Sequence, residues 1–224
     1  RDASNGAIDE NLGYFHSGFF DLGGQEVYVS RTGWTGELGY EIYSLGDRTD
    51  HPRLWNHLLK AGEPHGLEHS GSGSLEIRRL EAGILDNITD MDMSMTPFEA
   101  GLSPFIDMEK EGFVGWEALR SADRQTHLYG LRCKTAVPIM HETVSQDGAP
   151  VGRVTAGAWS PYLNAAVGYV RFGAPGDWVG RTLVLNSLER GEQACEIVSL
   201  PFYDAEKNIP RGLDTKIPMG PIHD

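Results

Sequence analysis

A carboxylate in the middle of a predicted strand is the first residue of this sequence that could do chemistry. Glu41 follows a segment in which Gly33, Gly36 and Gly39 recur at every third position. If the face of Glu41 is exposed to solvent, the residue is ordinary. If that face lines a cavity, the side chain is a fixed acceptor for the N–H groups of a ligand. The residue types alone leave both interpretations open.

Two short strands must position this side chain. Hydrophobic residues alternate with other types over residues 25–30 before the glycines and over residues 39–44 after them. This alternation on both sides of a glycine-rich segment predicts a strand, a turn and a second strand. Glycines allow such a turn to adopt positive φ angles or to pass close to another surface. We therefore predict a hairpin in which Glu41 lies on the face opposite Tyr40 and Ile42.

Composition narrows the class of protein. The chain has 224 residues, of which 40% are hydrophobic, and a net charge of −13. This acidity argues against a nucleic-acid groove or an anionic membrane surface as partner. No apolar run approaches the roughly 18 residues of a membrane span, and no signal peptide opens the sequence. Cys133 and Cys195 are far apart in the sequence, so we expect free thiols in a reducing, cytoplasmic setting and no metal site.

Helical periodicity is found in two places before residue 83. Pro52 and the spacing of the following leucines predict a helix that ends at Gly62, with Trp55 in the core. A second helix is predicted over residues 75–82, capped by Ser74. Arg79 lies in this helix, and two roles stay open for its side chain: it forms an ion pair, or it contacts a ligand.

Short β-like runs dominate the later part of the chain. Methionines at alternate positions over 91–95 favour a partly buried strand or an adaptable cavity wall. Five further runs predict a small antiparallel barrel or jelly-roll-like module, and they cover residues 127–134, 151–156, 165–172, 182–187 and 193–199.

The domain organisation follows from these runs and from the polar cluster at 121–125. We predict an α+β domain over residues 1–124, a β-barrel domain over 125–210 and a polar tail over 211–224.

Several sequence blocks resemble one enzyme family. The blocks cover residues 31–42, 79–83, 96–102, 112–115 with 118–119, Gly157 with 160–161, and 200–203. In their order and approximate spacing they resemble the aminomethyltransferases, the T-protein of glycine cleavage and its relatives. The resemblance implies part of the T-protein folate-binding fold followed by a C-terminal antiparallel β-barrel.

The same resemblance implies a function. Members of the family transfer one-carbon units to tetrahydrofolate, and some receive an aminomethyl group from a lipoylated carrier protein. In the family, a glutamate of the second strand holds the pterin ring, and the matching residue here is Glu41. Trp34, Tyr40 and Arg79 are the other residues for which we expect a folate contact, while Arg31 is expected to brace the turn. The catalytic residue remains unassigned.

Two features depart from the T-protein pattern. Leu75 occupies the place of an arginine that contacts folate in the family, which implies weaker folate affinity. The central motif begins near residue 30 instead of well inside the chain, so we expect this sequence to be the C-terminal part of a longer protein. The portion expected to be absent carries the family's aspartate that assists transfer. The tryptophan Trp34 and the residues 78–83 resemble more closely the dimethylsulfoniopropionate demethylase branch.

Two alternative functions stay open. One is a non-catalytic folate-binding relative that assists iron–sulfur assembly. That group carries a cysteine-containing motif, and this chain has Phe113 where the cysteine would lie. The other is the folate domain of a sarcosine or dimethylglycine oxidase fusion.

Overall fold

The structure is a computed structural model that describes residues 1–9 and 11–215. The chain divides into two compact units, one formed by Arg1–Glu76 with the described residues from Glu206 onward, and one formed by residues 77–205. The division falls inside helix α2 (Ser72–Glu81). The division predicted at 124–125 instead lies just before the first barrel strand. Most of the predicted tail, from residue 216 onward, lies outside the described residues.

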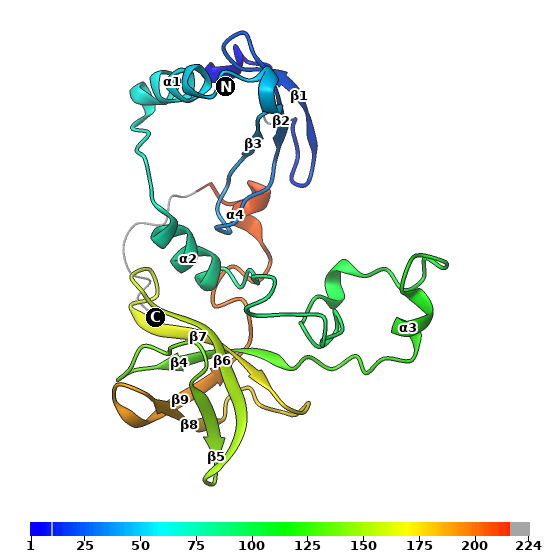
Figure 1. Cartoon of the computed structure of the whole chain (residues 1–224), viewed down its shortest axis with the longest axis vertical. Coiled ribbons are helices and arrows are strands. Elements are labelled where there is room, and N and C mark those ends of the chain that lie inside the picture. Colours follow the sequence, from blue (N-terminus) through cyan, green and yellow to red (C-terminus); the bar gives the residue numbers. More distant parts are fainter. Residues whose placement is uncertain (10, 216–224) are drawn as a thin grey trace. The chain divides into compact units, whose positions relative to one another are not determined.

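The first unit contains a three-stranded antiparallel sheet in the order β1-β2-β3 and the helix α1 (Figure 1). Its elements are η1 (Asp2–Ser4), β1 (Ser17–Asp21), β2 (Glu26–Ser30), β3 (Glu41–Tyr43), η2 (Gly46–Arg48), α1 (His51–Gly62), η3 (Glu63–His65) and α4 (Asn208–Arg211). The predicted hairpin is confirmed, because β2 and β3 pair directly.

The core of the first unit lies between one face of the sheet and α1. Val27 and Val29 are fully buried and pack in one cluster with Leu22 and Leu54. Burying an aliphatic side chain of this kind contributes about 1.5–3 kcal/mol, so this face fixes the orientation of β2. The predicted core position of Trp55 is wrong, since 49% of its surface is exposed. Only one stripe of α1 faces the sheet, and Trp55 lies outside that stripe.

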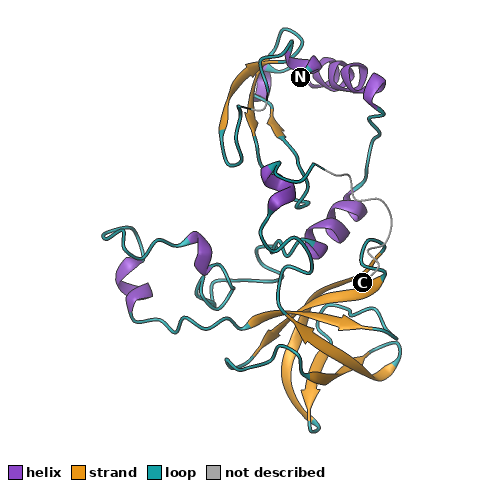
Figure 2. Ribbon diagram, turned by 180° about the vertical axis from the view of Figure 1, so that it is seen from behind, coloured by secondary structure: helices purple, strands orange, loops and turns teal. Residues whose placement is uncertain are grey.

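The second unit is built around a closed barrel whose strand order is β4-β7-β6-β5-β8-β9 (Figure 2). Its strands are β4 (Leu128–Cys133), β5 (Thr143–Gln146), β6 (Ala149–Ser160), β7 (Ala165–Phe172), β8 (Thr182–Ser187) and β9 (Gly191–Val198). The barrel closes where β9 pairs with β4. The five predicted runs are all strands, and the sequence analysis missed β5, which joins β6 through the tight turn at Asp147 and Gly148.

The segment before the barrel contains η4 (Ser103–Phe105) and α3 (Trp116–Arg120). The strand predicted from the alternating methionines is wrong. Met91 makes only an isolated bridge with Asn87, and Met93 is fully exposed. Alternation without a neighbouring strand to pair with is not sufficient to make a strand.

Two glycines of the family-like blocks allow close backbone approach. A Cβ on Gly157 would lie 2.0 Å from the carbonyl oxygen of Pro138. Gly83 has a φ of +70°, and a Cβ there would lie 2.9 Å from Pro201. The blocks at 79–83 and 200–203 therefore meet in space, beside a cluster that contains Leu80 and Phe202.

Among the described residues, no helix is long and apolar enough to cross a membrane.

Candidate functional site

Glu41 lies on the sheet face opposite the core of the first unit. It is the first residue of β3 and stands directly across from Ser30, while Tyr43 stands across from Tyr28. Because Val27 and Val29 point into the core, Tyr28 and Ser30 point to the other face, and Glu41 joins them there. The Glu41 side chain is half-buried. It is therefore neither fully exposed to solvent nor enclosed in a cavity, the two alternatives that the sequence left open.

Two hydroxyl groups hold one oxygen of the Glu41 carboxylate. Tyr43 Oη donates a hydrogen bond to Oε2 at 2.9 Å, and Thr32 Oγ1 donates to the same oxygen. Thr32 is fixed in turn by Ser30, whose hydroxyl lies 2.9 Å away. The other oxygen, Oε1, makes no hydrogen bond to any residue in the described part of the chain. Glu41 is thus oriented by neutral donors and keeps acceptor capacity for a further N–H group.

Neither hydroxyl partner was predicted from the sequence. Tyr43 could have been found, because residues i and i+2 of a strand share a face. Thr32 could not, since its position depends on how the glycine-rich turn folds back. The bond to Glu41 raises the pKa of the Tyr43 hydroxyl, because a donor to a carboxylate resists losing its proton.

Aromatic rings continue the same face beside Glu41. Phe19 and Tyr28 are 5.0 Å apart between ring centroids, and Tyr28 and Tyr43 are 6.3 Å apart. Phe19 is 62% exposed and Tyr43 49% exposed. The face therefore presents a carboxylate at the end of a row of aromatic rings, which suits a flat, polar ligand.

The glycine-rich turn is braced from within by Arg31, as predicted. Its guanidinium donates to the carbonyl oxygen of Gly39 at 3.1 Å and lies 5.1 Å from the ring centroid of Tyr40. Arg31 is buried, whereas Tyr40 and Trp34 are 41% and 38% exposed. Tyr40 and Arg31 also line a cavity of about 450 Å³ together with Tyr14. The exposed rings of Trp34 and Tyr40 remain accessible to a ligand.

Arg79 lies in a different environment, in the second unit. Its side chain is 4% exposed, and its Nη1 donates to Asp90 Oδ2 at 2.7 Å and to the carbonyl oxygen of Ile84 at 3.2 Å. Asp90 also accepts from Thr155 Oγ1 at 2.7 Å and from the backbone N–H of Asp86 at 2.8 Å. The ion-pair interpretation of Arg79 matches this environment, and a direct folate contact gains no support from it.

Three family-like blocks meet in a second cluster of charged residues close to Arg79. Glu81 is fully buried and accepts hydrogen bonds from Arg78 and from Ser160. Arg78 also donates to Tyr203 Oη at 2.8 Å and lies over the rings of Tyr162 and Tyr203. Packing of α2 on the barrel therefore accounts for the contacts among these blocks.

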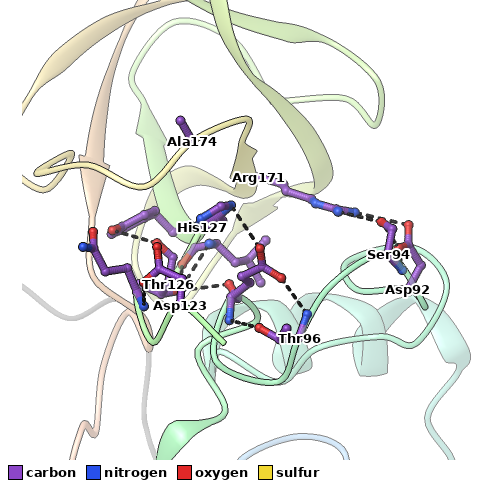
Figure 3. Close-up of polar contacts among 12 residues, drawn as sticks. Asp92, Ser94, Thr96, Asp123, Thr126, His127, Arg171 and Ala174 are labelled. Carbon is purple, nitrogen blue, oxygen red and sulfur yellow. Dashed lines mark hydrogen bonds and ion pairs between the residues drawn. The ribbon is translucent and has the colours of Figure 1, made fainter. Parts of the chain in front are cut away.

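A further family-like block, residues 96–102, is tied to the start of the barrel (Figure 3). Thr96 and Glu99 cap each other: the backbone N–H of Thr96 donates to Glu99 Oε2 at 2.6 Å, and the N–H of Glu99 to Thr96 Oγ1 at 3.2 Å. The backbone N–H of His127 donates to the carbonyl oxygen of Glu99 at 2.8 Å. In Figure 3 the Arg171 side chain reaches towards Asp92, 3.2 Å away. This block also serves structure.

The residues of the hairpin fit the pterin ring that the resemblance implies. A pterin presents an amine and a ring N–H side by side, and a carboxylate is the acceptor that matches them. Glu41 offers this acceptor next to exposed aromatic rings. Leu75 is 41% exposed and brings no charge, so the weaker affinity expected from it stays a prediction. Within the described residues, no group of three or more His, Cys, Asp or Glu side chains could hold a metal ion.

Comparison with known proteins gives two matches to family models. The GCVT N-terminal domain matches residues 2–110, and the glycine cleavage T-protein C-terminal barrel domain matches residues 127–204. The second match coincides with the six barrel strands.

Individual relatives agree with these matches. An aminomethyltransferase of Halothermothrix orenii is 34% identical in an alignment of 201 positions that covers 86% of this chain and 54% of that protein. One of Streptomyces avermitilis is 35% identical, over 83% of this chain and 52% of that protein. The crystal structure of the glycine cleavage aminomethyltransferase T of Bartonella henselae superposes with a TM-score of 0.73 at 26% identity, covering 89% of this chain and 55% of that one. The chain spans about half the length of the curated relatives it matches. It belongs to the aminomethyltransferase family, that of the glycine cleavage T-protein.

Proposed function

We propose that the β2–β3 hairpin holds the pterin ring of tetrahydrofolate in a protein that transfers one-carbon units. The observation that carries this proposal is the Glu41 carboxylate, which is oriented through one oxygen and open at the other. The two hydroxyl donors fix the carboxylate before a ligand arrives, so less conformational freedom is lost on binding.

Each hairpin residue has a distinct part in this proposal. Glu41 anchors the ring by accepting its adjacent N–H groups, and Thr32 and Tyr43 keep the carboxylate in place. The exposed rings of Phe19 and Tyr43, on the face of Glu41, stack on the pterin ring. Trp34 and Tyr40 contact other parts of the ligand from the glycine-rich turn. Arg79 contributes only indirectly, by fixing the second unit through Asp90.

The chemistry needs mainly placement from the protein. Tetrahydrofolate, when bound, supplies the N5 nucleophile that accepts the one-carbon unit. The hairpin lowers the cost of the reaction by holding the ring in one orientation and excluding water around it. Glu41 is an anchor in this scheme and not a base, because its carboxylate is engaged with hydroxyl donors and with the ring.

The identity of the one-carbon donor is a second part of the proposal. Our first candidate is an aminomethyl group delivered by a lipoylated carrier protein in the cytoplasm, as the resemblance to the T-protein implies. The resemblance of Trp34 and of residues 78–83 to the demethylase branch makes a methyl sulfonium the second candidate donor. Both donors use the same folate site, so the test of the site comes first.

The test is a titration of tetrahydrofolate against Glu41→Gln, on this chain and on any longer form in which it occurs. Glutamine keeps the size of the side chain but turns one acceptor into a donor that faces the ring's N–H groups. We expect the dissociation constant to rise about ten- to hundredfold, the equivalent of ~1.5–3 kcal/mol.

Glu26→Gln is the matched control, because it makes the same change of charge on an exposed residue of the same sheet. Its affinity should equal that of the unchanged protein. An unaltered affinity in Glu41→Gln would rule out the hairpin as the pterin site.

A further inference from the structure

The two cysteines face each other across the line where the barrel closes. Cys133 is the last residue of β4, and the antiparallel register places it directly opposite Cys195 of β9. Residues directly opposite in an antiparallel pair have Cα atoms about 4.5 or 5.5 Å apart. Both separations lie within the range of about 4.4–6.8 Å that a disulfide spans. The register therefore brings the two Cα atoms within the separation that a disulfide needs.

Both sulfur atoms lie on the inner side of the barrel. The two residues are each 2% exposed and belong to one core cluster with Leu131 and Ile197. The Cys133 sulfur lies 3.5 Å from the carbonyl oxygen of Ala194, the residue before Cys195, so it leans towards β9. Both thiols are free.

A small molecule has room beside this pair. Cys133 and Cys195 line a cavity of about 840 Å³, together with polar and aromatic residues such as Trp159 and Asn164. A compact reagent that enters this cavity lies against both cysteine residues.

The Cys195 thiol resists deprotonation. Burial, with the neighbouring Cys133 as the next cause, raises the pKa of the Cys195 thiol to about 12. The thiolate is the nucleophilic form of cysteine. A thiol that stays protonated is a poor first nucleophile, so Cys195 takes the second step in the reaction below.

We propose that Cys133 and Cys195 form an oxidation site at which a hydroperoxide converts the pair to a disulfide that locks β4 to β9. The Cys133 sulfur loses its proton and attacks the peroxide. The O–O bond breaks, an alcohol or water leaves with that proton, and Cys133 becomes a sulfenic acid.

Cys195 completes the reaction. Its sulfur attacks the sulfenic sulfur, the S–O bond breaks, and hydroxide leaves with the Cys195 proton as water. The two thiols together lose two electrons, and the peroxide gains two. The new bond joins the first and last strands of the barrel, which no turn connects. The folded barrel then cannot open at this line.

The experiment treats the folded 224-residue chain with hydrogen peroxide and counts thiols after unfolding in alkylating reagent. We expect the two thiols per chain to disappear together, with a mass about 2 Da lower, in a monomer that dithiothreitol restores. The melting temperature should rise by about 5–10 °C on oxidation.

Two variants separate the steps. Cys195→Ala should stop at the sulfenic acid, detected as a dimedone adduct on Cys133. Cys133→Ala should keep its remaining thiol under the same conditions, because the Cys195 thiol stays protonated. These results would support the proposal, and the wild-type thiol count tests it even if a variant fails to fold.

Several results would overturn the proposal. They are the retention of both thiols by the folded chain, the formation of disulfide-linked dimers, and a bond that forms only after urea has unfolded the barrel.

Discussion

Carboxylates in the two units are held in opposite ways. Glu41 in the hairpin is half-buried and accepts from neutral hydroxyl groups. Asp90 and Glu81 in the second unit are 1% and 0% exposed, and each is paired with an arginine. A fully buried charge requires a partner of opposite charge, because desolvation costs more than neutral hydrogen bonds return. A half-buried carboxylate can do without one, and for that reason it keeps capacity for a ligand.

The charged residues of a family-like block can therefore have one of two roles: they join elements of the fold, or they stay available to a ligand. The block around Arg79 and Glu81 is charged because it joins α2 to the barrel. The block around Glu41 is charged without such a task, since the core of the hairpin is formed by the other face of the sheet.

Breaking the Asp90 pair should have the largest effect. Arg79→Met keeps most of the side-chain volume but leaves Asp90 buried without its cation. We expect the second unit to lose about 3–5 kcal/mol of unfolding free energy, measured by urea denaturation of the whole chain. Arg120→Met is the control, because Arg120 and its partner Glu117 are exposed and 3.8 Å apart, and it should change stability by less than ~0.5 kcal/mol. Equal effects of the two substitutions would contradict the buried-pair interpretation.

Removing one hydroxyl from the same cluster should have a smaller effect. Thr155→Val keeps the shape of the side chain but deprives Asp90 Oδ1 of its donor. We expect a loss of about 1–3 kcal/mol by the same measurement. The matched control is Thr182→Val on an exposed position of β8, which should stay within ~0.5 kcal/mol. A neutral Thr155→Val would show that the hydrogen bond to Asp90 is not needed.

Glu41→Gln should shift the pKa of Tyr43 and hardly change the stability of the protein. Glu41→Gln weakens the bond that raises the pKa of Tyr43, so this pKa should fall towards its ordinary value of 10.0. A raised tyrosine pKa stabilises the fold below the pKa of the unfolded chain, and the contribution disappears as the pH rises through the folded value. NMR titration of the Tyr43 ring measures the shift, with Glu26→Gln as control. Stability at neutral pH should change by less than ~0.5 kcal/mol. A large loss there would place Glu41 with the structural carboxylates.

Local sequence patterns predicted much of the fold correctly. Alternation and glycines defined the hairpin and the face of Glu41, and regular spacing of short runs predicted the barrel. Both signals are local, because strand faces alternate with period two whatever the strand packs against. The strand β5 was missed because its four residues carry little periodicity of their own.

Only the tertiary structure decided which charged side chains form buried ion pairs and which keep capacity to bind a ligand. A bulge in β6 illustrates the reason: Val154 pairs with Val170 and Ala156 with Tyr169, so the extra residue Thr155 leaves the regular alternation. Its hydroxyl therefore reaches Asp90, a residue 65 positions earlier in the chain. The sequence determined by itself that Glu41 stands in a strand beside a glycine-rich turn. It could not determine that Arg79 forms a buried ion pair with Asp90, because burial depends on contacts between segments far apart in the chain.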